Sequence, residues 1–243
     1  MKPNPPGEDP PAGDVEIHHR HRDVTGGWLR PSVFGAMDGL VSNFALVAGV
    51  AAGSGQATVV ILSGLAGLVA GACSMSAGEY ISVASQAELA QAEIEVERRE
   101  LARRPQAERH ELARLYQARG LDSELAEEVA RQLSRNPQGA LEVHTREELG
   151  VSPGDLPSPL LAAGSSFLSF GVGAVLPLIP YFLGVERLWP AAAIAGAALF
   201  TAGAVVAKVT ARSWWYSGLR QLLFGAVAAA VTYGIGLLVG TTI

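Results

Sequence analysis

Two groups of side chains in this sequence have the types and spacing to bind a divalent cation. The first begins with Asp38, the only charged side chain in the apolar segment of residues 31–53. A carboxylate at the centre of a membrane span costs about 2.5–3.5 kcal/mol on insertion scales, so it is expected to face a partner, water or an ion. Ser42 and Asn43 follow about one helical turn later. Their oxygen atoms suit hard or borderline divalent cations.

The next apolar segment adds Met75 and Glu79, which are four residues apart and would share one face of a helix. A thioether prefers softer metals such as Fe²⁺ to Mg²⁺ or Ca²⁺, although most buried methionines simply fill gaps in a core. The alternative for Asp38 is that it caps a neighbouring backbone segment. The residues predicted to line a transport pathway are Asp38, Asn43, Met75 and Glu79.

Two pairs of glycines in the first apolar segment, Gly35 with Gly39 and Gly49 with Gly53, are each four residues apart. Such pairs of small residues let membrane helices approach closely. They indicate a helix that lines a pore or lies at a dimer axis, or glycines that serve packing alone.

The second group of candidate ligands lies in a charged part of the chain. Glu97 and Glu100 are three residues apart, as are Glu108 and Glu111, and Pro105 lies between the two pairs. Each pair falls on one helical face. If the two helices fold back as a hairpin, the four carboxylates meet. Clustered carboxylates repel one another unless cations offset their charge.

Glu148 could join this group, with His144 one turn before it on the last helix of the charged segment. The opposing interpretation is a solvated helix held by ion pairs between neighbouring side chains. The pairs in question are Glu95 with Arg98 and Arg99, and Glu100 with Arg103 and Arg104.

The N-terminal segment is rich in proline, glycine and acidic residues, and is expected to be disordered. His18, His19 and His21 could bind metal there. We favour instead a mobile tail that adds positive charge at low pH.

Composition places these groups in a membrane protein. The chain has 243 residues, of which 49% are hydrophobic and only 17% are charged, which fits an integral membrane protein better than a soluble domain. A net charge of −5 gives no support for nucleic-acid binding, and the single Cys73 excludes an intramolecular disulfide framework. Five segments are long enough to cross a bilayer. They are residues 32–52, 57–78, 159–183, 188–207 and 218–239.

A helical insert separates the second and third spans. Of the 23 acidic residues, 14 lie between Glu88 and Glu148, together with ten arginines. We expect the second span to continue as one helix to Arg104, where Pro105 stops it. Further helices are expected at residues 106–118, 122–134 and 138–149. In the third span, the glycines and prolines at positions 171, 173, 177 and 180 indicate a kinked or broken helix.

Lys and Arg in the short loops set the expected orientation. Arg30 precedes the first span, and Lys208, Arg212 and Arg220 flank the loop between spans four and five. This pattern predicts a cytosolic N-terminus and a cytosolic insert. We divide the fold into a disordered tail (1–30), spans one and two (31–87), a cytosolic helical metal-binding domain (88–152) and spans three to five (153–243).

Three stretches together resemble the vacuolar iron transporter family, and the chain looks like a prokaryotic-type member. They are residues 34–43 (FGAMDGLVSN), 62–82 (LSGLAGLVAGACSMSAGEYIS) and 146–150 (REELG). The first two are specific, whereas the third is weak alone. The resemblance extends from about residue 23 to the C-terminus.

The resemblance implies an all-α homodimer with five spans per protomer and the ion path between the protomers. It also implies export of Fe²⁺, with Mn²⁺ as a second substrate, from the cytosol in exchange for protons. Asp38 and Met75 match the pore ligands of the family, and Glu79 lies in its Gly-Glu-aromatic motif. The carboxylates that match the metal-binding domain of the family are Glu97, Glu100, Glu108, Glu111 and Glu148.

One departure concerns the metal-binding domain. Eukaryotic members carry a Met-Met pair just before the last glutamate, where this chain has His144 and Thr145. Histidine is also a good Fe²⁺ ligand. The departure therefore replaces soft sulfur ligands with the imidazole of His144, which can also bind the metal.

The sequence therefore predicts a proton-coupled divalent metal transporter that needs no prosthetic group, with Fe²⁺ or Mn²⁺ (and Zn²⁺ in vitro) as bound ion. Motifs of nucleotide hydrolases, zinc proteases and serine hydrolases are absent, so we expect no enzyme. With no organelle sorting signal recognised, we expect a prokaryotic plasma membrane as host. One rival hypothesis is a membrane-anchored metal sensor or buffer without transport. Another is a structural membrane protein whose insert binds a partner and no metal.

Overall fold

A computed structural model describes residues 27–210 and 212–240, and helices are the only regular elements in this part of the chain. The expectations for the N-terminal tail and its histidines lie outside the described residues. The elements are α1 (Leu29–Ser54), α2 (Ala57–Arg103), α3 (Pro105–Ala118), α4 (Ser123–Leu133), α5 (Pro137–His144), the π-helical turn η1 (Thr145–Leu149), α6 (Pro159–Val175), the 3₁₀ turn η2 (Leu176–Leu178), α7 (Ile179–Phe182), α8 (Leu188–Thr210) and α9 (Trp214–Gly240).

Five helical segments are long and apolar enough to cross a membrane, which confirms the predicted fold class. They are Leu29–Ser54, Ala57–Arg103, Pro159–Phe182, Leu188–Lys208 and Trp214–Gly240. Their bounds agree with the predicted spans to within a few residues at most ends. The large exception is α2, which runs on without a break far beyond its apolar part, as the uninterrupted sequence predicted.

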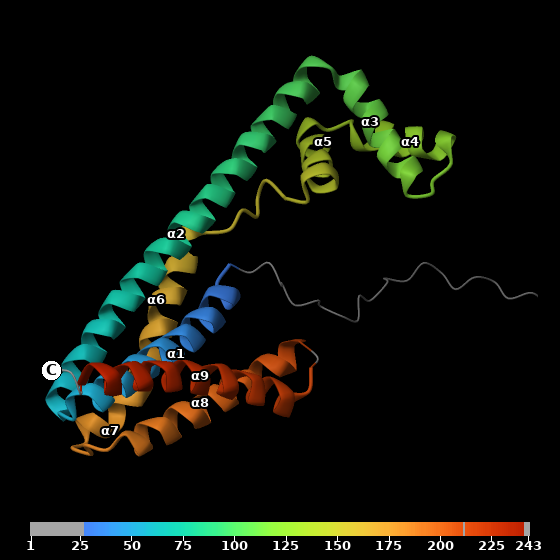
Figure 1. The fold of residues 1–243 in the computed structure, drawn as a ribbon. Coiled ribbons are helices and arrows are strands. Elements are labelled where there is room, and N and C mark those ends of the chain that lie inside the picture. The colour runs from blue at the N-terminus through green and yellow to red at the C-terminus, as the bar shows by residue number, and fades with distance from the viewer. Residues whose placement is uncertain (1–26, 211, 241–243) are drawn as a thin grey trace, which may run out of the picture.

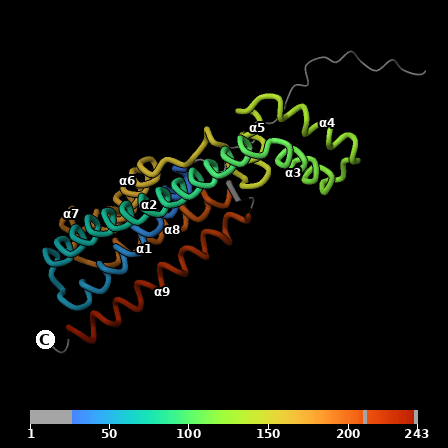
Figure 2. Tube along the Cα trace, turned by 90° about the horizontal axis from the view of Figure 1, so that it is seen from above, coloured from blue at the N-terminus to red at the C-terminus, as the bar shows by residue number. Residues whose placement is uncertain are grey.

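Helix α1 lies at the centre of the bundle and contacts α2, α6, α8 and α9 (Figure 1 and Figure 2). Glycines make the closest of these contacts. A Cβ atom at Gly39 would lie 2.2 Å from the backbone oxygen of Phe170 in α6, and one at Gly173 of α6 would lie 2.1 Å from the oxygen of Ala36. No side chain larger than hydrogen fits at this crossing, so the two backbones touch.

The second glycine pair of α1 packs against a glycine pair of α9. A Cβ at Gly236 would lie 2.0 Å from the oxygen of Gly49, and one at Gly240 would lie 2.5 Å from the oxygen of Gly53. The hydroxyl of Thr232 donates a 2.6 Å hydrogen bond across the same crossing to the oxygen of Ala45. Both glycine pairs of α1 thus pack inside the protomer, as the packing interpretation predicted.

The third span is broken as predicted. Its helix α6 ends at Val175, and a 3₁₀ turn carrying Pro177 leads into the short helix α7. Pro177 has no N–H group, so the regular hydrogen-bond ladder of α6 cannot continue past it.

The insert lies beyond one end of the bundle, where α2 projects from it (Figure 1). Helices α3 and α5 contact the projecting helix, and α4 packs against α3. Pro105 begins α3, as expected from its fixed φ angle. Asp122 caps α4 by accepting a 2.8 Å hydrogen bond from the backbone N–H of Leu125. A small core of Leu112, Ala113 and Ala130 joins α3 to α4.

Candidate functional site

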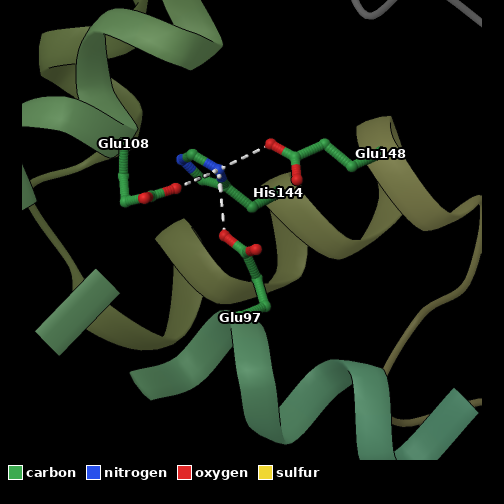
Figure 3. A group of neighbouring side chains, drawn as sticks. All are labelled: Glu97, Glu108, His144 and Glu148. Atoms are coloured by element: carbon green, nitrogen blue, oxygen red, sulfur yellow. Dashed lines mark hydrogen bonds and ion pairs between the residues drawn. The ribbon is translucent and has the colours of Figure 1, made fainter. Parts of the chain in front are cut away.

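Four side chains from four different elements converge in the insert. Glu97 comes from α2, Glu108 from α3, His144 from α5 and Glu148 from η1, and one ligand atom from each lies within 4.8 Å of all the others (Figure 3). The Nδ1 atom of His144 lies 3.2 Å from Oε1 of Glu97, 3.2 Å from Oε1 of Glu148 and 4.0 Å from Oε2 of Glu108. The hairpin predicted from Pro105 therefore forms and brings these groups together.

Three of these four side chains are largely removed from solvent. The side chain of His144 is fully buried, and those of Glu97 and Glu108 are 13% and 11% exposed. Nε2 of His144 is buried without a hydrogen-bond partner, and the buried Oε1 of Glu97 has only its 3.2 Å ion-pair contact with Nδ1 of His144. Buried polar atoms are normally paired, and one imidazole nitrogen with several carboxylate oxygens is a donor set for Fe²⁺, Mn²⁺ or Zn²⁺. The residues therefore fit a divalent cation.

Burial, and after it the repulsion between neighbouring carboxylates, raises the pKa of two members of the group. Burial, followed by the charges of Glu148, Glu108, Glu111 and Glu100, raises the pKa of Glu97 to about 7. Burial and the charge of Glu111 likewise raise the pKa of Glu108 above its ordinary value, although His144 opposes this shift. Carboxylates that repel one another in this way favour a bound cation or proton.

The predicted ligands Glu100 and Glu111 lie outside the group of four. They are still near enough for their charges to act on Glu97 and Glu108. The rival ion-pair interpretation holds for Glu95, which contacts Arg98 at 2.5 Å. Glu100 lies 3.9 Å from the exposed Arg104, and its charge also acts on Glu97.

The last helix of the insert differs from the prediction of one α-helix over residues 138–149. Helix α5 ends at His144 and a π-helical turn follows it. Within this turn the hydroxyl of Thr145 donates to the oxygen of Leu141 at 2.9 Å. Gly150 then ends the turn with φ 69°, a left-handed conformation that suits glycine.

A groove between α1 and α2 contains three of the four predicted pathway residues. It has a volume of about 410 Å³. Glu79 does not line it, but lies half-buried one turn beyond Met75 on α2. The lining consists of Asp38, Ser42, Asn43, Leu46, Gly67, Gly71, Ser74, Met75 and Phe170.

Several of the lining residues were not predicted. Gly67 and Gly71 keep the groove open, since a Cβ at Gly67 would lie 2.5 Å from Leu46 and one at Gly71 would lie 2.2 Å from the ring of Phe170. Their four-residue spacing on α2 was a signal that could have identified them. Phe170 belongs to α6, which is distant in sequence from α1 and α2, so no local sequence pattern identifies it as a lining residue.

Asn43 offers a fixed oxygen atom in this groove. Its Nδ2 atom donates a 2.6 Å hydrogen bond to the oxygen of Ala174, near the end of α6, where carbonyl groups lack helical partners. A carbonyl oxygen can only accept, so the nitrogen must face α6 and Oδ1 must face away from it. Oδ1 is buried without a hydrogen-bond partner, and a Cβ at Gly67 would lie 3.0 Å from it. This oxygen is therefore available to an ion or to water in the groove.

The chain is similar along most of its length to known proteins. The model of the VIT family matches residues 29–237. A vacuolar iron transporter of Acanthamoeba castellanii is 41% identical over 236 residues, which cover 94% of this chain and 84% of that protein. Vacuolar iron transporter 1 of Oryza sativa subsp. japonica is 31% identical, over 96% of this chain and 94% of that protein. The chain therefore belongs to the VIT family.

Proposed function

We propose that this protein is a proton-coupled transporter that exports Fe²⁺, with Mn²⁺ as a second substrate, from the cytosol. The proposal is supported by relatives named as vacuolar iron transporters and by the two candidate sites. The observation that carries it is the presence in one chain of a partly buried group with the side chains of a cation site, Glu97, Glu108, His144 and Glu148, and of a membrane groove containing Asp38.

The two sites have different roles in this proposal. The cluster in the insert gathers metal, with Glu100 and Glu111 adding negative charge around it. Asp38, Asn43 and Met75 pass the ion through the groove, and Glu79 lies beyond them on α2. Protonation of the intramembrane carboxylates from the far side displaces the metal and provides the coupling.

The orientation follows from the basic residues near the helix ends. Arg30, Lys208, Arg212 and Arg220 are all exposed and would lie on the cytosolic side, together with the insert. We further propose a homodimer in which a second copy closes the groove, and a prokaryotic plasma membrane as host. The division at residues 31–87, 88–152 and 153–243 then separates membrane parts from a cytosolic metal-binding domain.

A flux measurement tests the proposal against the rival sensor or buffer. The purified protein is reconstituted into liposomes, Fe²⁺ is supplied outside, and uptake is followed with and without an imposed pH gradient, with protein-free liposomes as the control. A transporter gives protein-dependent uptake that grows with the gradient. Metal binding without uptake would favour the sensor or buffer.

A further inference from the structure

Two consecutive glutamates on the turn η1 point to different partners. Glu148 lies 3.2 Å from His144 and belongs to the cluster. Glu147 instead forms an ion pair with Arg119 at the end of α3. The hydroxyl of Tyr116 donates to Oε1 of Glu147 at 3.4 Å, and the guanidinium of Arg119 lies 5.9 Å from the centre of the Tyr116 ring. We call Glu147, Arg119 and Tyr116 the clamp.

The clamp joins η1 to α3, in addition to the contacts that η1 makes with α5 and α2. The turn η1 has five residues and ends at Gly150, beyond which an irregular linker leads to α6. Turns of this π-helical type are uncommon and occur frequently at functional sites. The Glu148 side chain is 23% exposed, more than those of Glu97 and Glu108. The rotation of the turn about its axis therefore decides whether Glu148 reaches the cluster.

The clamp fixes that rotation. Glu147 and Glu148 are consecutive residues of the turn, so their side chains point in different directions. Holding Glu147 against Arg119 and Tyr116 leaves Glu148 facing His144. Glu147 is only 18% exposed, while Arg119 is 52% exposed. Tyr116 also packs against the core that joins α3 to α4. The clamp is thus anchored to the same helix that supplies Glu108.

We propose that Glu147, Arg119 and Tyr116 are positioning residues that set the orientation of Glu148 as a metal ligand. This inference rests on the proposed metal binding by the cluster. A positioning role differs from a purely structural role in one respect. Removing the clamp should weaken metal binding only when Glu148 is present as a ligand.

Mn²⁺ binding to the full-length protein in lipid nanodiscs tests this proposal, with free Mn²⁺ measured by electron paramagnetic resonance. We expect Glu147→Gln and Arg119→Gln to weaken Mn²⁺ affinity about tenfold, the lower end of the range for groups that orient metal ligands. Arg119→Lys keeps the charge and should restore part of the affinity. Glu142→Gln is the matched control, because Glu142 pairs with exposed Arg146 on the same short segment at 2.5 Å and should leave affinity unchanged.

A double variant separates positioning from general stability. Glu148→Gln alone should weaken binding, and Glu147→Gln added to it should weaken binding no further. An additional loss in the double variant, or wild-type affinity in Glu147→Gln, would overturn the inference. If Glu147→Gln does not fold, Tyr116→Phe removes only one hydrogen bond and should still weaken binding about two- to threefold; wild-type affinity in that variant would equally overturn the inference. Absence of Mn²⁺ binding by the wild type would refute the proposed metal site itself.

Discussion

The Nδ1 atom of His144 lies 3.2 Å from Oε1 of Glu97, although the two residues belong to α5 and α2. This contact closes the fold-back of the insert, because it brings its last helix against the helix that leaves the membrane bundle. In the same place, burial and the neighbouring carboxylates raise the pKa of Glu97 to about 7. The carboxylates at the centre of the insert thus repel one another when no cation is bound. The first two predictions follow from this repulsion.

Glu97→Gln should weaken metal affinity and stabilise the metal-free protein. The substitution removes a ligand oxygen and also one of the charges that repel in the cluster. We expect at least about a tenfold loss of Mn²⁺ affinity and a higher melting temperature without metal. Glu95→Gln is the matched control, since Glu95 lies two residues away and pairs with Arg98 in solvent. Equal affinity in wild type and Glu97→Gln would remove Glu97 from the site.

The stability of the metal-free protein should fall as pH rises from about 4.5 to about 7. Glu97 has an ordinary pKa of 4.5 and a folded pKa of about 7, so the folded state binds more protons than the unfolded state in this window. The stabilisation is therefore fully present below pH 4.5 and is lost as pH rises through 7. Thermal melting at a series of pH values measures this, and Glu97→Gln should flatten the dependence. Stability that rises with pH in the wild type and not in Glu97→Gln would contradict the raised pKa.

The affinity for metal should rise with pH, whereas the stability of the metal-free protein falls. Mn²⁺ must displace the proton from Glu97 below pH 7, so apparent affinity should rise with pH up to about 7 and then level off. Titrations at a series of pH values check this. A pH-independent affinity between 5 and 7 would mean that Glu97 does not take part in binding.

Gly67→Ala should slow transport without affecting the cluster. The new Cβ would lie 2.5 Å from Leu46 and 3.0 Å from Oδ1 of Asn43, so it would narrow the groove. Gly78→Ala on the same helix is the control, because a Cβ there meets nothing within 4 Å in the protomer. We expect reduced uptake into liposomes for Gly67→Ala and wild-type Mn²⁺ affinity for both variants. Unchanged uptake by folded Gly67→Ala would exclude this part of the groove from the path.

Gly236→Ala should destabilise the bundle by about 1–3 kcal/mol, the usual cost of overpacking. Its Cβ would lie 2.0 Å from the backbone oxygen of Gly49, and backbone atoms cannot move aside as a side chain can. Gly234→Ala is the control, since its Cβ would have open space. Thermal melting in detergent compares the two variants. Equal melting temperatures would mean that α1 and α9 do not pack through these glycines.

Sequence reasoning succeeded where local patterns carried the information. The apolar segments predicted the spans, and Pro105 predicted the end of the long second helix, which stops at Arg103, because proline lacks the backbone donor that a continuing helix needs. The spacing of Glu97 and Glu108 around Pro105 predicted that they meet. The π-helical turn after His144 could not be predicted in this way, because no proline or glycine lies between His144 and Leu149 to mark a change of helix type.

Contacts between elements distant in sequence were also beyond local patterns. Phe170 lines the groove and Arg119 pairs with Glu147 only because tertiary packing brings their helices together. The same applies to the division of the six predicted ligands of the insert into four that converge and two that remain nearby. Their spacing places Glu100 on the same helical face as Glu97, and Glu111 on the same face as Glu108. It does not determine the direction in which each side chain points.

The most direct test of the transport proposal combines binding and flux in one variant, Asp38→Asn. Its Mn²⁺ affinity is measured in nanodiscs, and its Fe²⁺ uptake into liposomes is measured under an imposed pH gradient. Asp38 lies in the groove and not in the cluster, so we predict wild-type affinity together with loss of gradient-driven uptake. Wild-type uptake by Asp38→Asn would contradict the proposed path through the membrane.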